Sequence, residues 1–251
     1  METHAHELHK APGHGWKHYF FEFFMLFLAV FCGFLAENFR EELVQHRQER
    51  EFMQSMMEDL QTDTSKLTHQ IAFGKMVSSN IENLISLLND EEVKDSTEKL
   101  YFLNRMAGRI VRVEFEDRTS SQLKNAGNMR LIRNKRVVDS IRNYWSTMKI
   151  EDDIEERLQT SGSKAGDISM KLFYTKYYHY TNRQDPLNSQ VTVLPGAKLI
   201  NNDPALLAEY ANRRQSGLFI LNNYIVNLQK SNIEAANLLQ LIRKEYHFEN
   251  Q

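Results

Sequence analysis

The chain has 251 residues and a formal net charge of −2, so no basic surplus favours nucleic-acid binding. A single cysteine, Cys32, excludes a disulfide framework and a cysteine-based zinc site. Glycine (10) and proline (4) are scarce, which favours long helices over a sandwich or a barrel, since those folds need many turns.

One strongly apolar segment lies near the N-terminus of an otherwise polar chain. From Tyr19 to Ala36 it has 18 residues, with Glu22 as its only charge. As a helix it would extend about 27 Å, close to the hydrocarbon thickness of a bilayer. Trp16 before it and Arg40 after it are suitable interfacial anchors. The pattern predicts a transmembrane helix over residues 19–36, with the lipid bilayer as its partner.

A cleaved signal peptide and a buried core helix are the alternatives to a membrane span. A signal peptide needs small residues just before its cleavage site, and Phe34 occupies a position where a small side chain is required. A core helix would need a less polar domain around it. We therefore favour an uncleaved anchor. Glu22 would lie near the lipid headgroups or would meet a partner in the membrane.

The charge pattern around the segment does not decide its orientation. Lys10 and Lys17 precede it, and three arginines follow closely, so the count is nearly balanced. Residues 1–18 form a histidine-rich leader, which we expect to be a flexible polar tail. Its histidines are potential transition-metal ligands, but we expect no metal site.

Beyond the apolar segment the sequence predicts a stalk helix over residues 37–72, which contain no glycine or proline. The residues are mostly strong helix formers. Apolar side chains fall near heptad spacing with a break at Asp63 or Thr64, which predicts a coiled coil that self-associates weakly on its own. These apolar residues are Met53, Met56, Leu60 and Leu67.

Residues 73–251 are expected to form an antiparallel bundle of about four to six helices. A cap at Asn134 predicts a long helix after it. Asp203 followed by Pro204 predicts the start of the last helix, which runs to about Tyr246.

Other segments of the bundle show weaker signals. A helix is predicted over 97–113, and residues 181–203 form a long irregular loop with a short strand at 191–194. The predicted fold class is all-α: one N-terminal transmembrane helix continuing into a long stalk helix and an antiparallel helical bundle.

The sequence lacks three common catalytic and metal-binding motifs. It has no Gly-x-Ser-x-Gly, no His-Glu-x-x-His and no Glu-x-x-His. We expect no enzyme activity, no cofactor and no nucleic-acid partner. Basic and aromatic residues nevertheless recur in two segments and define a possible ligand or partner surface. They are Arg130, Arg133, Arg136, Tyr144, Trp145, Tyr177 and Tyr178.

Two stretches resemble a family of uncharacterised single-pass membrane proteins of the Bacteroidota. The first has Asp59, Leu60 and Asp63 in a Leu-x-x-Asp-Leu-x-x-Asp-like pattern, with Met56 at its first position. The second has matching residues at Leu123, Gly127, Leu131, Ile132, Asn134, Tyr144 and Trp145. The resemblance implies a membrane-anchored helical domain and no particular activity. It also implies an inner-membrane location, with a cytoplasmic N-terminus and a periplasmic C-terminal domain.

Two functions are compatible with these observations. The first is a non-enzymatic membrane protein whose helical domain self-associates or binds another envelope protein. The alternative is a ligand-sensing helical domain of the chemoreceptor type without a signalling module. A pocket lined by tyrosines and arginines would favour the sensor, and a broad apolar patch would favour partner binding.

Overall fold

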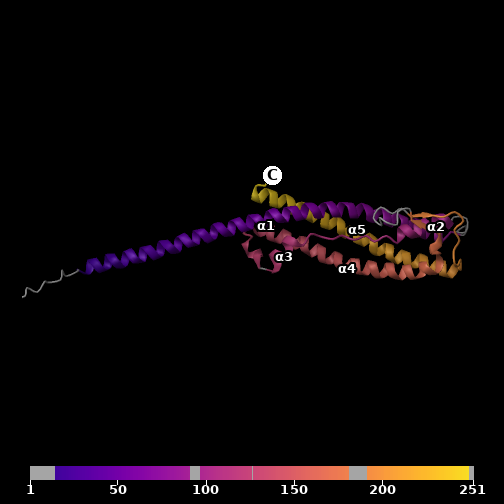
Figure 1. The fold of residues 1–251 in the computed structure, drawn as a ribbon, viewed down its shortest axis with the longest axis horizontal. Helices are drawn as coiled ribbons and strands as arrows, with labels where there is room; N and C mark the ends of the chain where they lie inside the picture. Colours follow the sequence, from indigo (N-terminus) through magenta and orange to yellow (C-terminus); the bar gives the residue numbers. More distant parts are fainter. Residues whose placement is uncertain (1–14, 91–96, 126, 181–190, 249–251) are drawn as a thin grey trace, which may run out of the picture. The chain divides into compact units, whose positions relative to one another are not determined.

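The computed structural model describes residues 15–90, 97–125, 127–180 and 191–248, and its helical content confirms the all-α prediction. Figure 1 shows the arrangement of the elements. The helices are α1 (Trp16–Leu88), α2 (Thr97–Ala107), α3 (Arg118–Asn125), α4 (Lys135–Leu172) and α5 (Pro204–Tyr246), with two 3₁₀ turns, η2 (Asn128–Leu131) and η3 (Thr175–Tyr177). Two short strands, β1 (Tyr178–Tyr180) and β2 (Val191–Val193), pair antiparallel.

The chain divides into two compact units, Met1–Glu51 and Phe52–Gln251. The first contains the apolar part of α1, and α1 is long and apolar enough to cross a membrane by length and composition, a property that an N-terminal signal sequence shares. Its apolar window is not buried against any part of the described chain. His18 lies 3.0 Å from Glu22. The histidine-rich leader was predicted over residues 1–18, without a metal site. Most of it, residues 1–14, lies outside the described residues.

The second unit, called the bundle here, is built on three long helices. They are α4, α5 and the part of α1 from Phe52 onward, which lie along one another (Figure 1). Asn134 at the start of α4 donates to Glu245 near the end of α5 at 2.7 Å, so these two helices run antiparallel. Residues 52–72, predicted as a stalk, belong to the bundle.

Helix α1 continues through Gly74 without a break. A Cβ added at Gly74 would lie 3.0 Å from Cγ1 of Ile225 on α5 and 3.4 Å from Cγ1 of Val111. The glycine therefore permits a close approach of α1, α5 and the extended chain after α2.

The predicted helix caps are present. The side chain of Asn134 accepts from the backbone N–H groups of Arg136 and Val137 at 3.0 and 3.4 Å. Asp203 accepts from Ala205 N–H at 3.2 Å, with Pro204 in the first turn. These contacts satisfy N–H groups that have no partner inside the helix.

The end of α2 differs from the sequence prediction. Helix α2 ends at Ala107 rather than near residue 113. The chain after it is extended and packs against α1, where Lys66 donates to the Glu114 carbonyl at 2.9 Å. This contact to a distant helix is not visible in a local sequence pattern.

The bundle contains two apolar cores. The first core is built on Leu67, Val77, Ile81, Leu84, Leu100, Tyr101, Ile154, Ile168, Leu172, Tyr210, Leu221 and Leu228. The second core is built on Met53, Met56, Leu60, Leu123, Ile132, Val137, Ile141, Tyr144, Ala235, Leu238 and Ile242.

A buried polar layer lies where the three long helices pass from one core to the other. It consists of Asp63 on α1, Tyr144 and Glu151 on α4, and Ser231 on α5. Tyr144 donates to Asp63 at 2.7 Å, and Ser231 donates to Glu151. The break in the heptad pattern at Asp63 therefore marks a hydrogen-bonded contact between helices rather than a loss of packing.

Candidate functional site

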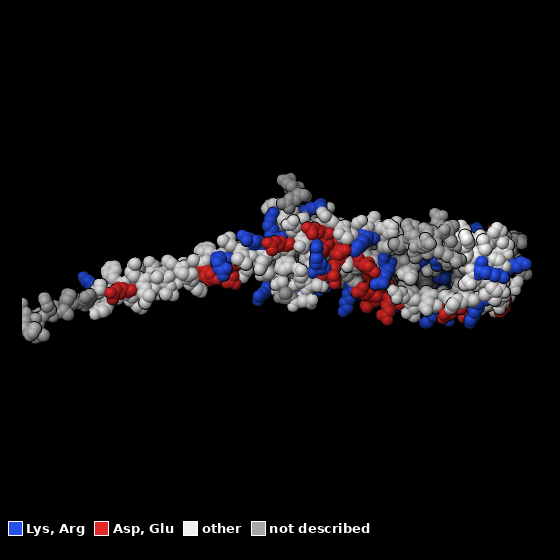
Figure 2. Space-filling model, viewed as in Figure 1, with Lys and Arg blue, Asp and Glu red and all other residues white. Residues whose placement is uncertain are grey.

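A cavity of about 770 Å³ opens in the bundle on the side of the first core. Its apolar lining includes Val77 and Ile81 from α1, Leu158 from α4 and Leu221 from α5. The volume falls within the range typical of sites for small organic molecules. Figure 2 shows a hollow in this face of the bundle, with blue basic atoms at its floor.

One wall of the cavity is formed by small residues of α4. The segment SGSKAG (161–166) is helical and lies within α4. A Cβ added at Gly162 or Gly166 would meet no heavy atom within 4 Å. The small side chains therefore leave open space beside α4.

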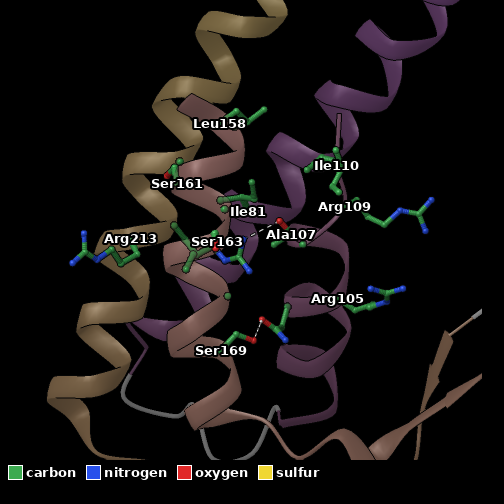
Figure 3. A pocket seen from close by; sticks show the side chains of 18 of the residues that line it. Ile81, Arg105, Ala107, Arg109, Ile110, Leu158, Ser161, Ser163, Ser169 and Arg213 are labelled. Atoms are coloured by element: carbon green, nitrogen blue, oxygen red, sulfur yellow. Dashed lines mark hydrogen bonds between the residues drawn. The ribbon is translucent and has the colours of Figure 1, made fainter. Parts of the chain in front are cut away.

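Four arginines contribute to the lining, against one acidic residue, Asp167. Figure 3 shows Arg105 and Arg109 extending away from α4 and α5, and Arg213 extending outward on the opposite side. Arg214, by contrast, is only 7% exposed. The charge in the cavity interior is thus carried by Arg214.

Arg214 is held by two hydrogen bonds at the end of α2. Its Nε donates to the Tyr210 hydroxyl at 2.9 Å, and its Nη1 donates to the Ala107 carbonyl at 3.0 Å. Ala107 is the last residue of α2, so the cation also faces the negative end of that helix.

Asn104 connects this arginine to the strands. Its Oδ1 accepts from the hydroxyls of Tyr210 and Ser169, and its Nδ2 donates to the Tyr178 hydroxyl at 2.8 Å. Burial raises the pKa of Tyr178 to about 12, so this hydroxyl is protonated at neutral pH. The cavity floor is a rigid polar network formed by α2, α4, α5 and β1.

The carboxyl of Glu151, in the polar layer, is a second chemically unusual group besides the Arg214 guanidinium. It is 2% exposed, and its Oε2 has no hydrogen-bond partner. Burial raises the Glu151 pKa to about 7, helped by the charges of Asp152 and Asp63. Burial also raises the pKa of Asp63.

A second, smaller cavity of about 380 Å³ is acidic. Four carboxylates line it together with Arg112, whose Nε lies 3.2 Å from Glu155. Acidic side chains gather on this face in the middle of the bundle (Figure 2). In the part of the chain that the structure describes, no group of three or more metal-ligating side chains is placed to hold a metal ion.

The residues predicted as a ligand or partner surface are distributed between two regions. Tyr144 and Trp145 pack with the second core, and Tyr177 and Tyr178 pack with the first. Arg136 forms an ion pair with Glu245 at 3.5 Å, and Arg130 and Arg133 lie near it in sequence, around η2. Of the predicted surface, only Tyr178 lines the large cavity.

The residues that carry the family resemblance have structural roles in the bundle. Met56, Leu60, Leu123 and Ile132 meet in the second core. Asp59 accepts from the Thr119 backbone N–H at 3.1 Å and from Arg118 at 3.0 Å. Gly127 has a φ of 65°, a conformation that glycine adopts readily.

Arg214 was not singled out by the sequence analysis, although a signal for it exists. It lies on the apolar face of α5, in the series Leu207, Tyr210, Arg214, Leu218 and Leu221. A charged residue at a core position of an amphipathic helix indicates a buried polar contact or a binding site.

Together these features define an all-helical bundle with an arginine-floored cavity, preceded in the chain by an apolar helix long enough to span a membrane. Comparisons with protein-family models, curated proteins and solved structures found no match to this chain.

Proposed function

We propose that the protein is a membrane-anchored ligand-binding protein whose bundle binds a small organic molecule in the large cavity. The observation that carries this proposal is a cavity of about 770 Å³ with apolar walls and a buried arginine at its floor. Sites for small molecules combine mostly apolar walls with a few fixed polar groups in this way. The ligand-sensing alternative is therefore preferred over partner binding.

The proposal includes a single-pass location in the inner membrane, with the N-terminus cytoplasmic and the bundle periplasmic. The apolar helix and the resemblance to Bacteroidota membrane proteins support it. A reporter that is active only in the cytoplasm, fused after Gln251, should be inactive. Activity of that fusion would contradict the orientation.

Filling the cavity tests ligand binding. Gly166→Phe places a ring in the open space beside α4, whereas Gly166→Ala adds only a methyl group. Both variants should fold, because glycine is the less favourable residue in a helix interior. A library of small organic molecules, screened by ligand-observed NMR against the full-length protein in nanodiscs, should give hits for wild type and Gly166→Ala.

The same hits should disappear with Gly166→Phe, while its circular dichroism spectrum matches that of wild type. Hits that persist unchanged in the phenylalanine variant, or a library without any hit on the wild-type protein, would contradict a ligand-binding function for this cavity.

A second candidate function, self-association or binding to another envelope protein, is favoured by one observation on α5. Phe219, Val226 and Ile233 are 75%, 61% and 60% exposed and lie seven residues apart, so they share one helix face. Phe219→Lys with Ile233→Lys should convert an oligomer to a monomer in native mass spectrometry from mild detergent. A wild-type protein that is already monomeric would contradict self-association.

A further inference from the structure

Arg214 carries a buried charge for which the described residues provide no anionic partner. No carboxylate among the described residues forms an ion pair with it. Its two hydrogen bonds go to a hydroxyl and to a carbonyl, both uncharged. A cation that is nearly excluded from water is costly unless an anion compensates it.

The guanidinium retains donors for such an anion. It has five N–H groups, and the hydrogen bonds to Tyr210 and Ala107 use one on Nε and one on Nη1. The remaining N–H groups are on the Nη1 and Nη2 side of the planar fork. This geometry matches a carboxylate, which accepts two parallel hydrogen bonds from a guanidinium.

The rest of the cavity limits the ligand to one negative charge. Arg105 and Arg109 extend away from α4 and α5, and Arg213 extends outward on the other side (Figure 3). The interior therefore offers a single compensating charge, and a dianionic phosphate would leave a buried excess negative charge.

The cavity walls determine the polarity of the rest of the ligand. Val77, Ile81 and Leu221 are buried apolar residues on α1 and α5 that line the cavity. The part of the ligand that contacts these side chains must itself be apolar, because a polar group there would lose its hydrogen bonds to water. The cavity is also much larger than a carboxylate group alone.

We propose that the cavity binds a monocarboxylate with an apolar body, whose carboxylate is held by Arg214. This inference rests on the proposed ligand-binding function and names its ligand class. Arg214 is then the residue that selects acids over uncharged compounds of the same shape.

The test uses 4-phenylbutyrate as the probe and 4-phenylbutyramide as its uncharged counterpart. Binding is measured by isothermal titration and ligand-observed NMR with the full-length protein in nanodiscs, and empty nanodiscs correct for partitioning into lipid. Wild type should bind the acid about tenfold more tightly than the amide, since a charge-assisted hydrogen bond is stronger than a neutral one.

Variants assign the preference to one residue. Arg214→Gln should abolish the preference for the acid, and Arg214→Lys, which keeps the charge, should retain part of it. Arg243→Gln is the matched control, because it removes an exposed arginine of the same helix that does not line the cavity, and it should leave the preference unchanged. Circular dichroism melting checks that each variant is folded, and the lysine variant keeps the test valid if the glutamine variant does not fold.

The outcomes separate this inference from the proposed function. Equal binding of acid and amide by wild type, with both lost in Gly166→Phe, would overturn the monocarboxylate assignment and leave cavity binding standing. Binding of neither probe by wild type would also overturn the assignment. Binding that Gly166→Phe does not reduce would locate the probes elsewhere and contradict both proposals.

Discussion

Replacing Asp63 by alanine is expected to lower the free energy of unfolding of the bundle by about 3 kcal/mol. Asp63 is 1% exposed and accepts from the Tyr144 hydroxyl at 2.7 Å and from the Glu116 backbone N–H at 2.8 Å. The alanine variant leaves both donors without this acceptor. Part of this loss of stability is offset, because the variant no longer buries a carboxylate whose charged form burial disfavours, as the raised Asp63 pKa indicates.

The measurement is urea unfolding of the full-length protein in mild detergent, followed by circular dichroism. Asp63→Asn should lose about half as much stability, since the amide oxygen retains one donor. Asp139→Ala is the control, because Asp139 is exposed and lies 3.7 Å from Arg142; its effect should be under about 0.5 kcal/mol. Equal stabilities of the Asp63→Ala and Asp139→Ala variants would show that the polar layer does not stabilise the bundle.

Replacing Glu151 by glutamine is expected to make the bundle more stable at pH 8 than wild type, by up to about 3 kcal/mol. Burial raises the Glu151 pKa from its ordinary 4.5 to about 7 in the folded protein. The unfolded chain therefore loses its proton first as the pH rises, and wild-type stability falls between about pH 4.5 and pH 7. The rise in pKa corresponds to about 3 kcal/mol, at about 1.4 kcal/mol per pH unit.

The glutamine variant lacks this ionisation, so its advantage over wild type should grow by about 2 to 3 kcal/mol between pH 5 and pH 8. Comparing the two proteins at each pH cancels the titration of the other carboxylates. Glu156→Gln, a change at an exposed position of the same helix, should show no such growth. A difference between wild type and Glu151→Gln that is independent of pH would contradict a raised Glu151 pKa.

Much of the architecture could be predicted from local sequence signals. The caps at Asn134 and Asp203 define the starts of α4 and α5, and the end of α5 at Tyr246 was placed correctly. These features depend on hydrogen bonds within a few residues of each other, so a short stretch of sequence contains the information.

The cavity could not be predicted in the same way, because its residues come from four separate segments of the chain. Arg214 meets Ala107, which is 107 residues away in sequence. Tyr177 and Tyr178 were both predicted as part of a possible ligand or partner surface, but no local sequence signal indicated that Tyr178 alone would line the cavity. The long apolar helix near the N-terminus, in contrast, depends on composition alone and is evident in the sequence.

The polar layer also fixes how far each of the three long helices is shifted along its axis relative to the other two. If one helix slid by a turn along its neighbours, Asp63 or Glu151 would face leucine and isoleucine side chains instead of its hydroxyl partner. A buried polar contact of this kind selects one register and penalises the others. Val77 lies about 21 Å along α1 from Asp63, so the layer determines which side chains face one another across the distant cavity. A variant that weakens the layer should therefore allow helix sliding and alter the shape of the cavity without changing any residue that lines it.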